Sequence, residues 1–161
     1  MEELRRLRGI AEYQFGTGCG EALFPECIAV EYSKTTGRLR HVFFEEKLVA
    51  TLKPDDGFLA LTVYGAELLL SRMRNPGFTV TVKEGVEGEI AEGKSVFAKH
   101  VVAADPSIRP GDEIVVLDRE RRVIAVGKAL LNGEEMLVFR TGVAVKVRRG
   151  RLKEESEQDY E

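Results

Sequence analysis

The stretch that decides the fold is GKSVFAKHVVAADPSIRPGDEIVVLDRERRVIAVGKALLNGEEMLVFRTGVAVKVRRG, which runs from Gly93 to Gly150. Short apolar runs rich in valine and isoleucine alternate there with turns that contain glycine, proline, asparagine or aspartate. Short strands separated by turns, with few helices, predict a small β barrel or sandwich. Strands are expected at 79–82, 96–104, 114–117, 123–130 and 143–147, and short helices at 88–92 and 134–139.

The same region also contains the sequence pattern of a phosphate-binding loop. Residues 88–95 read GEIAEGKS, and the apolar run 114–117 ends in Asp118, a residue type that binds Mg²⁺. A phosphate loop must lead into a long helix, but the β-branched and aromatic residues after Ser95 favour a strand. Three glutamates in and beside the loop would repel a triphosphate. An ATP-dependent enzyme is therefore a weaker alternative, and we assign Asp118 to a turn.

Five segments, taken in order, resemble a PUA domain, the compact RNA-binding pseudobarrel of pseudouridine synthases and archaeosine transglycosylases. They are GKSVFAK at 93–99, IRPGDE at 108–113, AVGKA at 125–129, EEM at 134–136 and GVAVKV at 142–147. Together they cover about 70 residues in the order that the family has, which makes the resemblance specific. The region is most similar to the version at the C-terminus of archaeal tRNA-guanine transglycosylases.

The first half of the chain has a different pattern. Apolar residues at helical spacing predict an amphipathic helix over residues 3–14, which ends at the glycines of 16–20. An antiparallel meander and a helix are expected to follow, with strands at 27–32, 39–44 and 48–52 and the helix at 66–73. Residues 59–64 fit a strand or a helix. The triplet Asn75-Pro76-Gly77 predicts the domain boundary.

This half resembles the small domain that precedes the PUA domain in archaeal tRNA-guanine transglycosylases. The matching segments are YQFG at 13–16, ALF at 22–24, TGRLR at 36–40 and the stretch from DGF at 56–58 to Gly65 and Ala66. We therefore expect an α+β fold: a small N-terminal α/β domain with an antiparallel sheet at 1–76, then a PUA-type β pseudobarrel at 77–150. Residues 151–161 hold two basic and five acidic residues without apolar periodicity, so we expect a disordered acidic tail.

The resemblance carries no catalytic residue onto this chain. In those enzymes the nucleophilic aspartate and the zinc site belong to a catalytic barrel, and we expect the chain to start after that barrel. Its two cysteines and two histidines form no zinc motif. No catalytic residue, metal or cofactor is therefore expected. The chain has no long apolar run, so no membrane partner is expected, and we predict a cytoplasmic protein.

Recognition of RNA is the expected function, and tRNA is the expected RNA. The predicted RNA-binding residues are Gly93, Lys94, Ser95, Lys99, Arg148, Arg149 and Arg151. Backbone N–H groups at Gly93 and Lys94 are expected to approach a phosphate, Ser95 to donate its hydroxyl, and the basic side chains to contact phosphates. The resemblance implies that residues 93–99 and the last strand lie together. A second RNA or partner patch is expected at Lys34, Arg38 and Arg40.

Two roles remain open for such an RNA-binding protein. One is an accessory module that presents tRNA to a separate catalytic subunit in archaeosine-type transglycosylation. The other is an independent RNA-binding factor in ribosome assembly or translation. The formal net charge of −3 comes from the last eleven residues, and a basic cluster at 148–151 precedes them, so the charge permits a local RNA site.

Overall fold

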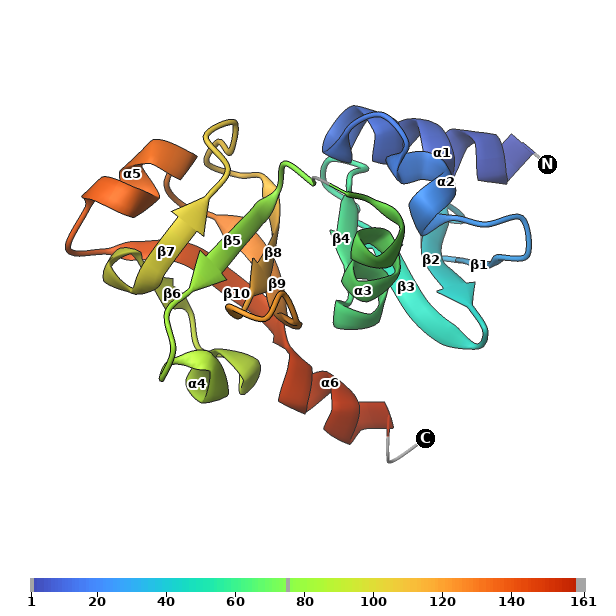
Figure 1. The fold of residues 1–161 in the computed structure, drawn as a ribbon. Helices are drawn as coiled ribbons and strands as arrows, with labels where there is room; N and C mark the ends of the chain where they lie inside the picture. Colours follow the sequence, from blue (N-terminus) through green and yellow to red (C-terminus); the bar gives the residue numbers. More distant parts are fainter. Residues whose placement is uncertain (1, 75, 159–161) are drawn as a thin grey trace. The chain divides into compact units, whose positions relative to one another are not determined.

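The computed structural model describes residues 2–74 and 76–158, which form two compact units (Figure 1). The first unit comprises residues 1–76 and the second residues 77–161. Asn75, part of the triplet expected at the boundary, lies outside the described residues, as do residues 159–161 of the expected tail. No helix in the described ranges is long and apolar enough to cross a bilayer.

The N-terminal unit combines three helices with a four-stranded antiparallel sheet of order β1-β2-β3-β4 within the described residues. Helices α1 and α3 contact strands of this sheet, and α2 contacts both helices. The elements are α1 (Glu2–Phe15), α2 (Cys19–Leu23), β1 (Ala29–Tyr32), β2 (Leu39–Phe44), β3 (Lys47–Leu52), β4 (Leu59–Leu61) and α3 (Val63–Arg72).

Local sequence explains the helices of this unit. Leu7, Ala11 and Phe15 recur every four residues, and all three are buried on one face of α1. Thr62 caps α3, because its side-chain oxygen accepts a hydrogen bond from the backbone N–H of Gly65 at 2.9 Å. Because of this cap, α3 begins at Val63, three residues before the predicted start. Residues 59–64, whose sequence fits a strand or a helix, are therefore divided between β4 and α3. The short helix α2 was not predicted.

The C-terminal unit is a curved six-stranded sheet with short helices at its edges. Its strand order is β6-β10-β9-β8-β5-β7, in which only β5 and β8 pair in parallel among the described strands. The elements are β5 (Thr79–Val82), α4 (Glu87–Ala91), β6 (Val96–Phe97), the 3₁₀ helix η1 (Ala98–His100), β7 (Val101–Ala104), β8 (Glu113–Leu117), β9 (Val123–Ala129), α5 (Gly133–Val138), β10 (Val143–Gly150) and α6 (Arg151–Gln158).

The connection between β6 and β7 forces this sheet to curl. These two strands are the opposite edges of the sheet, yet only the three residues of η1 join them. Edge strands of a flat six-stranded sheet lie about 24 Å apart at the usual spacing. A linker this short spans at most roughly 14 Å even when extended. The sheet must therefore bend until its edges approach, which produces the PUA-type pseudobarrel of an α+β chain.

The single long strand expected at 96–104 was therefore wrong in one respect. The chain leaves the sheet at η1, so the stretch forms two strands on opposite edges instead of one. Valine and alanine fit both a continuous strand and a broken one, and no glycine or proline marks the break. Every residue of β8 is buried, and its Ile114 and Val116 pack with Val80, Ile108 and Met136 in one apolar core.

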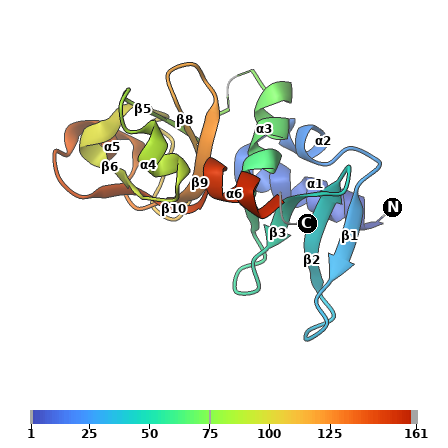
Figure 2. The same cartoon turned by 90° about the horizontal axis from the view of Figure 1, so that it is seen from below.

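The acidic C-terminal segment also differs from its expected state, because residues Arg151–Gln158 form helix α6 directly after β10 (Figure 2). Arginine, leucine, lysine, glutamate and glutamine are all good helix formers. Arg151 pairs with Glu155 one turn later, at 3.3 Å. The side chain of Glu154 is 7% exposed, so the helix packs against the unit. The prediction of disorder rested on the lack of apolar periodicity and did not include helix propensity.

The end of β10 packs directly against the backbone at the end of helix α4, and the residue at this contact is a glycine. A side-chain carbon added at Gly150 would lie 2.2 Å from the carbonyl oxygen of Ala91 and 2.7 Å from the backbone nitrogen of Gly93. Only a residue without a side chain allows two backbones to come this close. Gly150 therefore fixes the loop after α4 against the last strand.

We expect Gly150→Ala to lower the free energy of unfolding by about 1–3 kcal/mol, because the methyl group must displace backbone atoms. Gly88→Ala is the matched control, since a side-chain carbon there meets nothing within 4 Å and alanine favours the helix that contains it. Urea unfolding of both variants measures the difference. Equal stability of the two variants would contradict the proposed contact.

Candidate nucleic-acid interface

Residues 93–99 lie along the last strand of the C-terminal unit. Strand β6 pairs antiparallel with β10, so that Phe97 lies opposite Val143 and Val96 opposite Val145. One step further along, the backbone N–H of Val147 donates a 3.4 Å hydrogen bond to the hydroxyl oxygen of Ser95. This pairing brings the two predicted RNA-binding segments side by side.

The loop at Gly93 has a role different from the one expected. The N–H of Gly93 donates to the carbonyl of Ile90 at 2.9 Å, and the N–H of Lys94 donates to the carbonyl of Glu89 at 3.1 Å. With Gly93 at φ +111°, this pair of bonds is the Schellman motif that ends α4. Both amides are occupied, so the expectation that they hold a phosphate is corrected.

The lysine side chains around this loop remain exposed. Lys94 extends from the loop, and Lys153 of α6 lies beside it, with its amino group 3.7 Å from where a side chain at Gly93 would begin. At the other end of β6, the amino group of Lys99 lies 5.9 Å from the centre of the Phe97 ring. We call Lys94, Lys99 and Lys153 the basic strip. Lys153 was not predicted, because it falls in the segment expected to be disordered.

An exposed aromatic ring accompanies Lys99. Phe97 is 46% exposed, and the ring of His100 packs edge-on against it with centroids 5.9 Å apart. Burial lowers the pKa of His100 below its ordinary value, and the nearby charges of Lys83 and Lys99 lower it further. The imidazole is therefore neutral at pH 7, and the positive charge at this end of β6 comes from lysine.

The three predicted arginines are engaged inside the unit. The guanidinium of Arg148 makes a two-point contact with the buried carboxylate of Glu113, at 2.7 and 2.5 Å. Arg149 pairs with Glu154 at 3.6 Å and with Glu157 at 3.4 Å. Arg151 donates to the carbonyl of Val123 at 2.9 Å and pairs with Glu155. Their first role is to hold β10 and α6 in place.

Two further lysines lie on this sheet. Lys128 of β9 and Lys146 of β10 are directly opposite each other in the register and are both exposed. Like charges in this position are unfavourable unless an anion lies near them. The sequence offered a weak signal for them, since each interrupts a run of apolar residues.

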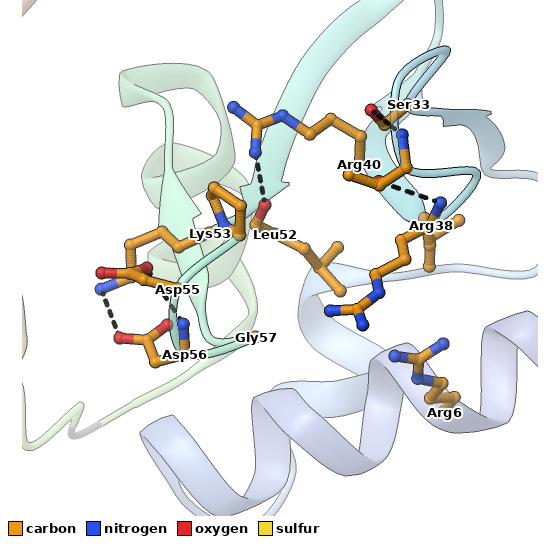
Figure 3. A pocket seen from close by; sticks show the side chains of 12 residues that line it. Arg6, Ser33, Arg38, Arg40, Leu52, Lys53, Asp55, Asp56 and Gly57 are labelled. Atoms are coloured by element: carbon orange, nitrogen blue, oxygen red, sulfur yellow. Dashed lines mark hydrogen bonds and ion pairs between the residues drawn. The ribbon is translucent and has the colours of Figure 1, made fainter.

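The second predicted patch forms part of a cavity of about 320 Å³ in the N-terminal unit (Figure 3). Arg38 and Arg40 line it together with Arg6 of α1 and Lys53 after β3, whereas Lys34 is not among its lining residues. Arg6 and Lys53 were missed, because they are far from the hairpin in sequence. The remaining lining residues are Ser33, Thr36, Leu39, Leu52, Pro54, Asp55, Asp56 and Gly57.

The phosphate-loop pattern does not have the geometry of a nucleotide site. The chain enters it through helix α4 and leaves it through strand β6, the reverse of the required strand-to-helix order. Asp118 closes the turn between β8 and β9, because one of its carboxylate oxygens accepts hydrogen bonds from the N–H groups of Glu120 and Arg122, both at 2.9 Å. Burial alone would raise the pKa of Asp118, but its hydrogen bonds from Arg122 and Glu120 outweigh it and lower the pKa.

Groups of metal-ligating side chains are absent from the described ranges: no three His, Cys, Asp or Glu residues there are placed to hold a metal ion. The two thiols differ from each other. Cys19 is buried, and this burial raises its pKa to about 11. Cys27 is exposed.

Both units match known families. Residues 5–76 match the patch-forming domain C2 of tRNA-guanine transglycosylase, and residues 78–151 match the PUA domain. The tRNA-guanine(15) transglycosylase of Methanobrevibacter smithii is 41% identical over 94% of this chain and 23% of its own length. That of Thermococcus kodakarensis is 45% identical over 92% of this chain and 25% of its own. The chain thus spans about a quarter of the length of these relatives.

Two solved structures resemble this chain over most of its length. A conserved PUA domain protein from Thermoplasma acidophilum is 28% identical with a TM-score of 0.67, and the match covers 92% of this chain and 88% of that one. A hypothetical protein from Pyrococcus horikoshii is 24% identical with a TM-score of 0.74, over 92% and 90% of the two chains. The second likeness concerns the fold alone.

We expect Arg148→Ala to lower the free energy of unfolding by about 2–3 kcal/mol, because it leaves the buried carboxylate of Glu113 without its guanidinium. Lys94→Ala is expected to change that energy by less than about 0.5 kcal/mol, since Lys94 is exposed. Urea unfolding separates the two cases. An Arg148→Ala variant with the same free energy of unfolding as the wild type would refute the structural role of this ion pair.

Proposed function

We propose that this chain, which joins a C2 domain of the tRNA-guanine transglycosylase family to a PUA domain, is a non-catalytic module that docks on tRNA for a tRNA-modifying enzyme. The observation that carries the proposal is its similarity, over more than nine-tenths of its length, to enzymes named for their action on tRNA. The chain corresponds to only part of those enzymes. We therefore assign it their binding of RNA and not their chemistry.

The basic strip is the proposed contact surface. Its three lysines are exposed, Lys94 in the loop before β6, Lys99 in η1 and Lys153 in α6. Lysine suits this task, because a mobile ammonium follows phosphates of varied geometry at little cost. Phe97 beside Lys99 offers a ring on which an unpaired base can stack.

Arg149 and Arg151 are additional contacts to RNA beside the basic strip. Each is only about a third exposed and already pairs with a glutamate of α6. A phosphate can replace the exposed Glu157 and Glu155 as partner, whereas Glu154 is buried and stays with Arg149. The carboxylates of α6 thus compete with RNA, which favours a modest affinity and sensitivity to salt.

Each histidine of the chain has a partner among the described residues. His41 lies 3.2 Å from the exposed carboxylate of Glu31, and His100 packs against Phe97, so neither imidazole stands beside a serine or cysteine nucleophile in the described contacts. An independent RNA-binding factor in ribosome assembly or translation is the alternative. Co-purification separates the two: a catalytic transglycosylase subunit supports the first, and ribosomal particles support the second.

The salt dependence of tRNA binding tests the strip. With three to four phosphates neutralised, the logarithm of the association constant falls with the logarithm of salt concentration with a slope of roughly −3 to −4. We expect Lys94→Ala combined with Lys153→Ala to bring that slope about two units closer to zero. Titration of labelled, unfractionated tRNA at several salt concentrations measures it.

Arg109→Ala serves as the control for that titration. Arg109 is exposed in the turn before β8, and no interaction of its side chain is recorded among the described residues. Its removal subtracts one positive charge from the same unit without touching the strip. If Arg109→Ala flattened the slope as much as a strip substitution, binding would follow net charge, and the proposed surface would be refuted.

A further inference from the structure

The cavity of the N-terminal unit is lined by more positive than negative charge. Arg6, Arg38, Arg40 and Lys53 face two aspartates, Asp55 and Asp56, so the lining carries a net charge of +2. Both aspartates are used by the loop before β4. Asp56 accepts the backbone N–H of Phe58 at 2.8 Å and pairs with Lys53 at 3.4 Å, and Asp55 accepts the N–H of Asp56 at 3.0 Å.

Two guanidinium groups are left over for a ligand. Arg40 donates a long 3.4 Å hydrogen bond to the carbonyl of Leu52. No hydrogen bond or ion pair is recorded for the side chains of Arg6 and Arg38 within residues 2–74 and 76–158. Figure 3 shows both guanidinium groups extending into the same space, one from α1 and the other from the hairpin between β1 and β2. Two guanidinium groups that extend into one space, with no carboxylate paired to either among the described residues, suit a phosphate between them.

An exposed aromatic pair joins α1 to the loop before β4, and both of these segments also line the cavity. Tyr13 of α1 is 81% exposed, and it stacks on Phe58 with ring centroids 5.9 Å apart and planes 9° from parallel. Phe58 directly follows Gly57, which lines the cavity. Arg6 and Tyr13 are seven residues apart on α1, which places them on one face about 10 Å from each other along the axis.

The aromatic pair is fixed in place by Gln14. Its side-chain amide donates to the carbonyl of Leu59 and accepts the N–H of Leu59, both at 2.8 Å. These two bonds clamp the residue after Phe58 to the residue after Tyr13. The outer face of Tyr13 is therefore a preorganised platform, and a planar group stacks on it without ordering the ring first.

We propose that the N-terminal unit binds one unpaired nucleotide of the RNA, with its phosphate at Arg6 and Arg38 and its base stacked on Tyr13. The inference rests on the proposed function and adds a second site to it. An acidic protein segment would satisfy the two arginines, but it would leave the open ring of Tyr13 without a role. A nucleotide uses both, because every base has a face that stacks on an aromatic ring.

Binding of unfractionated tRNA to the full chain tests the site. We expect Tyr13→Ala to weaken binding about five- to a hundredfold, the loss of one stacked base, and to leave the salt slope unchanged. Tyr13→Phe keeps the ring and is expected to bind like the wild type. Arg6→Gln is expected to weaken binding and to bring the slope about one unit closer to zero. Arg5→Gln is its matched control, since Arg5 precedes Arg6 on α1 but does not line the cavity.

Each contrary outcome has a distinct meaning. Normal binding by Tyr13→Ala, together with weak binding by the basic-strip variant, would refute the nucleotide site and leave the proposed function standing. Equal losses in Tyr13→Phe and Tyr13→Ala would refute stacking. A polyglutamate peptide that binds through Arg6, with tRNA affinity unaffected by these variants, would assign the cavity to an acidic protein segment. Failure of the wild type to bind tRNA would refute the proposed function itself.

Discussion

The three-residue link between β6 and β7 is the constraint on which the C-terminal unit depends. It joins the two edges of a six-stranded sheet, so the sheet curls until these edges approach, and both described edge strands are short. Closure also sets which segments become neighbours. Because β6 is held at the edge beside β10, residues 93–99 lie next to the end of the chain's last strand. The position of β6 beside β10 in the pseudobarrel thus determines where the candidate interface lies.

Arginine and lysine have separate tasks around this edge. Arg148 lies against a buried carboxylate and Arg151 against a backbone carbonyl, positions that suit a planar group with several fixed donors. The lysines of the basic strip remain in solvent. This division explains how a unit with a negative C-terminal segment can present positive charge: the glutamates of α6 are matched by arginines, and the lysines stay available.

Much of the fold could be predicted from the sequence. Alternating apolar residues located most strands, and the order of the segments identified both domains. Two features could not be predicted, for physical reasons. The break at η1 depends on sheet closure, which is a property of the whole unit and leaves no mark in the local sequence. Helix α6 depends on propensity and on the packing of Glu154, neither of which a search for apolar periodicity detects.

The candidate site was predictable at the level of segments and less so at the level of atoms. The stretch 93–99 and the last strand do lie together, but Gly93 ends a helix and its amide is not free. A C-cap glycine and a phosphate-binding glycine share the same positive φ, so sequence does not distinguish them. Arg6 and Lys53 were missed because only the folded chain brings them to the cavity, and Lys153 was missed because its segment was expected to be disordered.

Lysine protection by bound tRNA tests the central claim most directly. An amine-reactive reagent labels the exposed lysines of the free chain, and mass spectrometry reports which of them tRNA shields. We predict strong protection of Lys94, Lys99 and Lys153, and unchanged labelling of Lys47, which is exposed beside Tyr64 in the other unit. Unchanged labelling of the three strip lysines in a saturated complex would contradict the account.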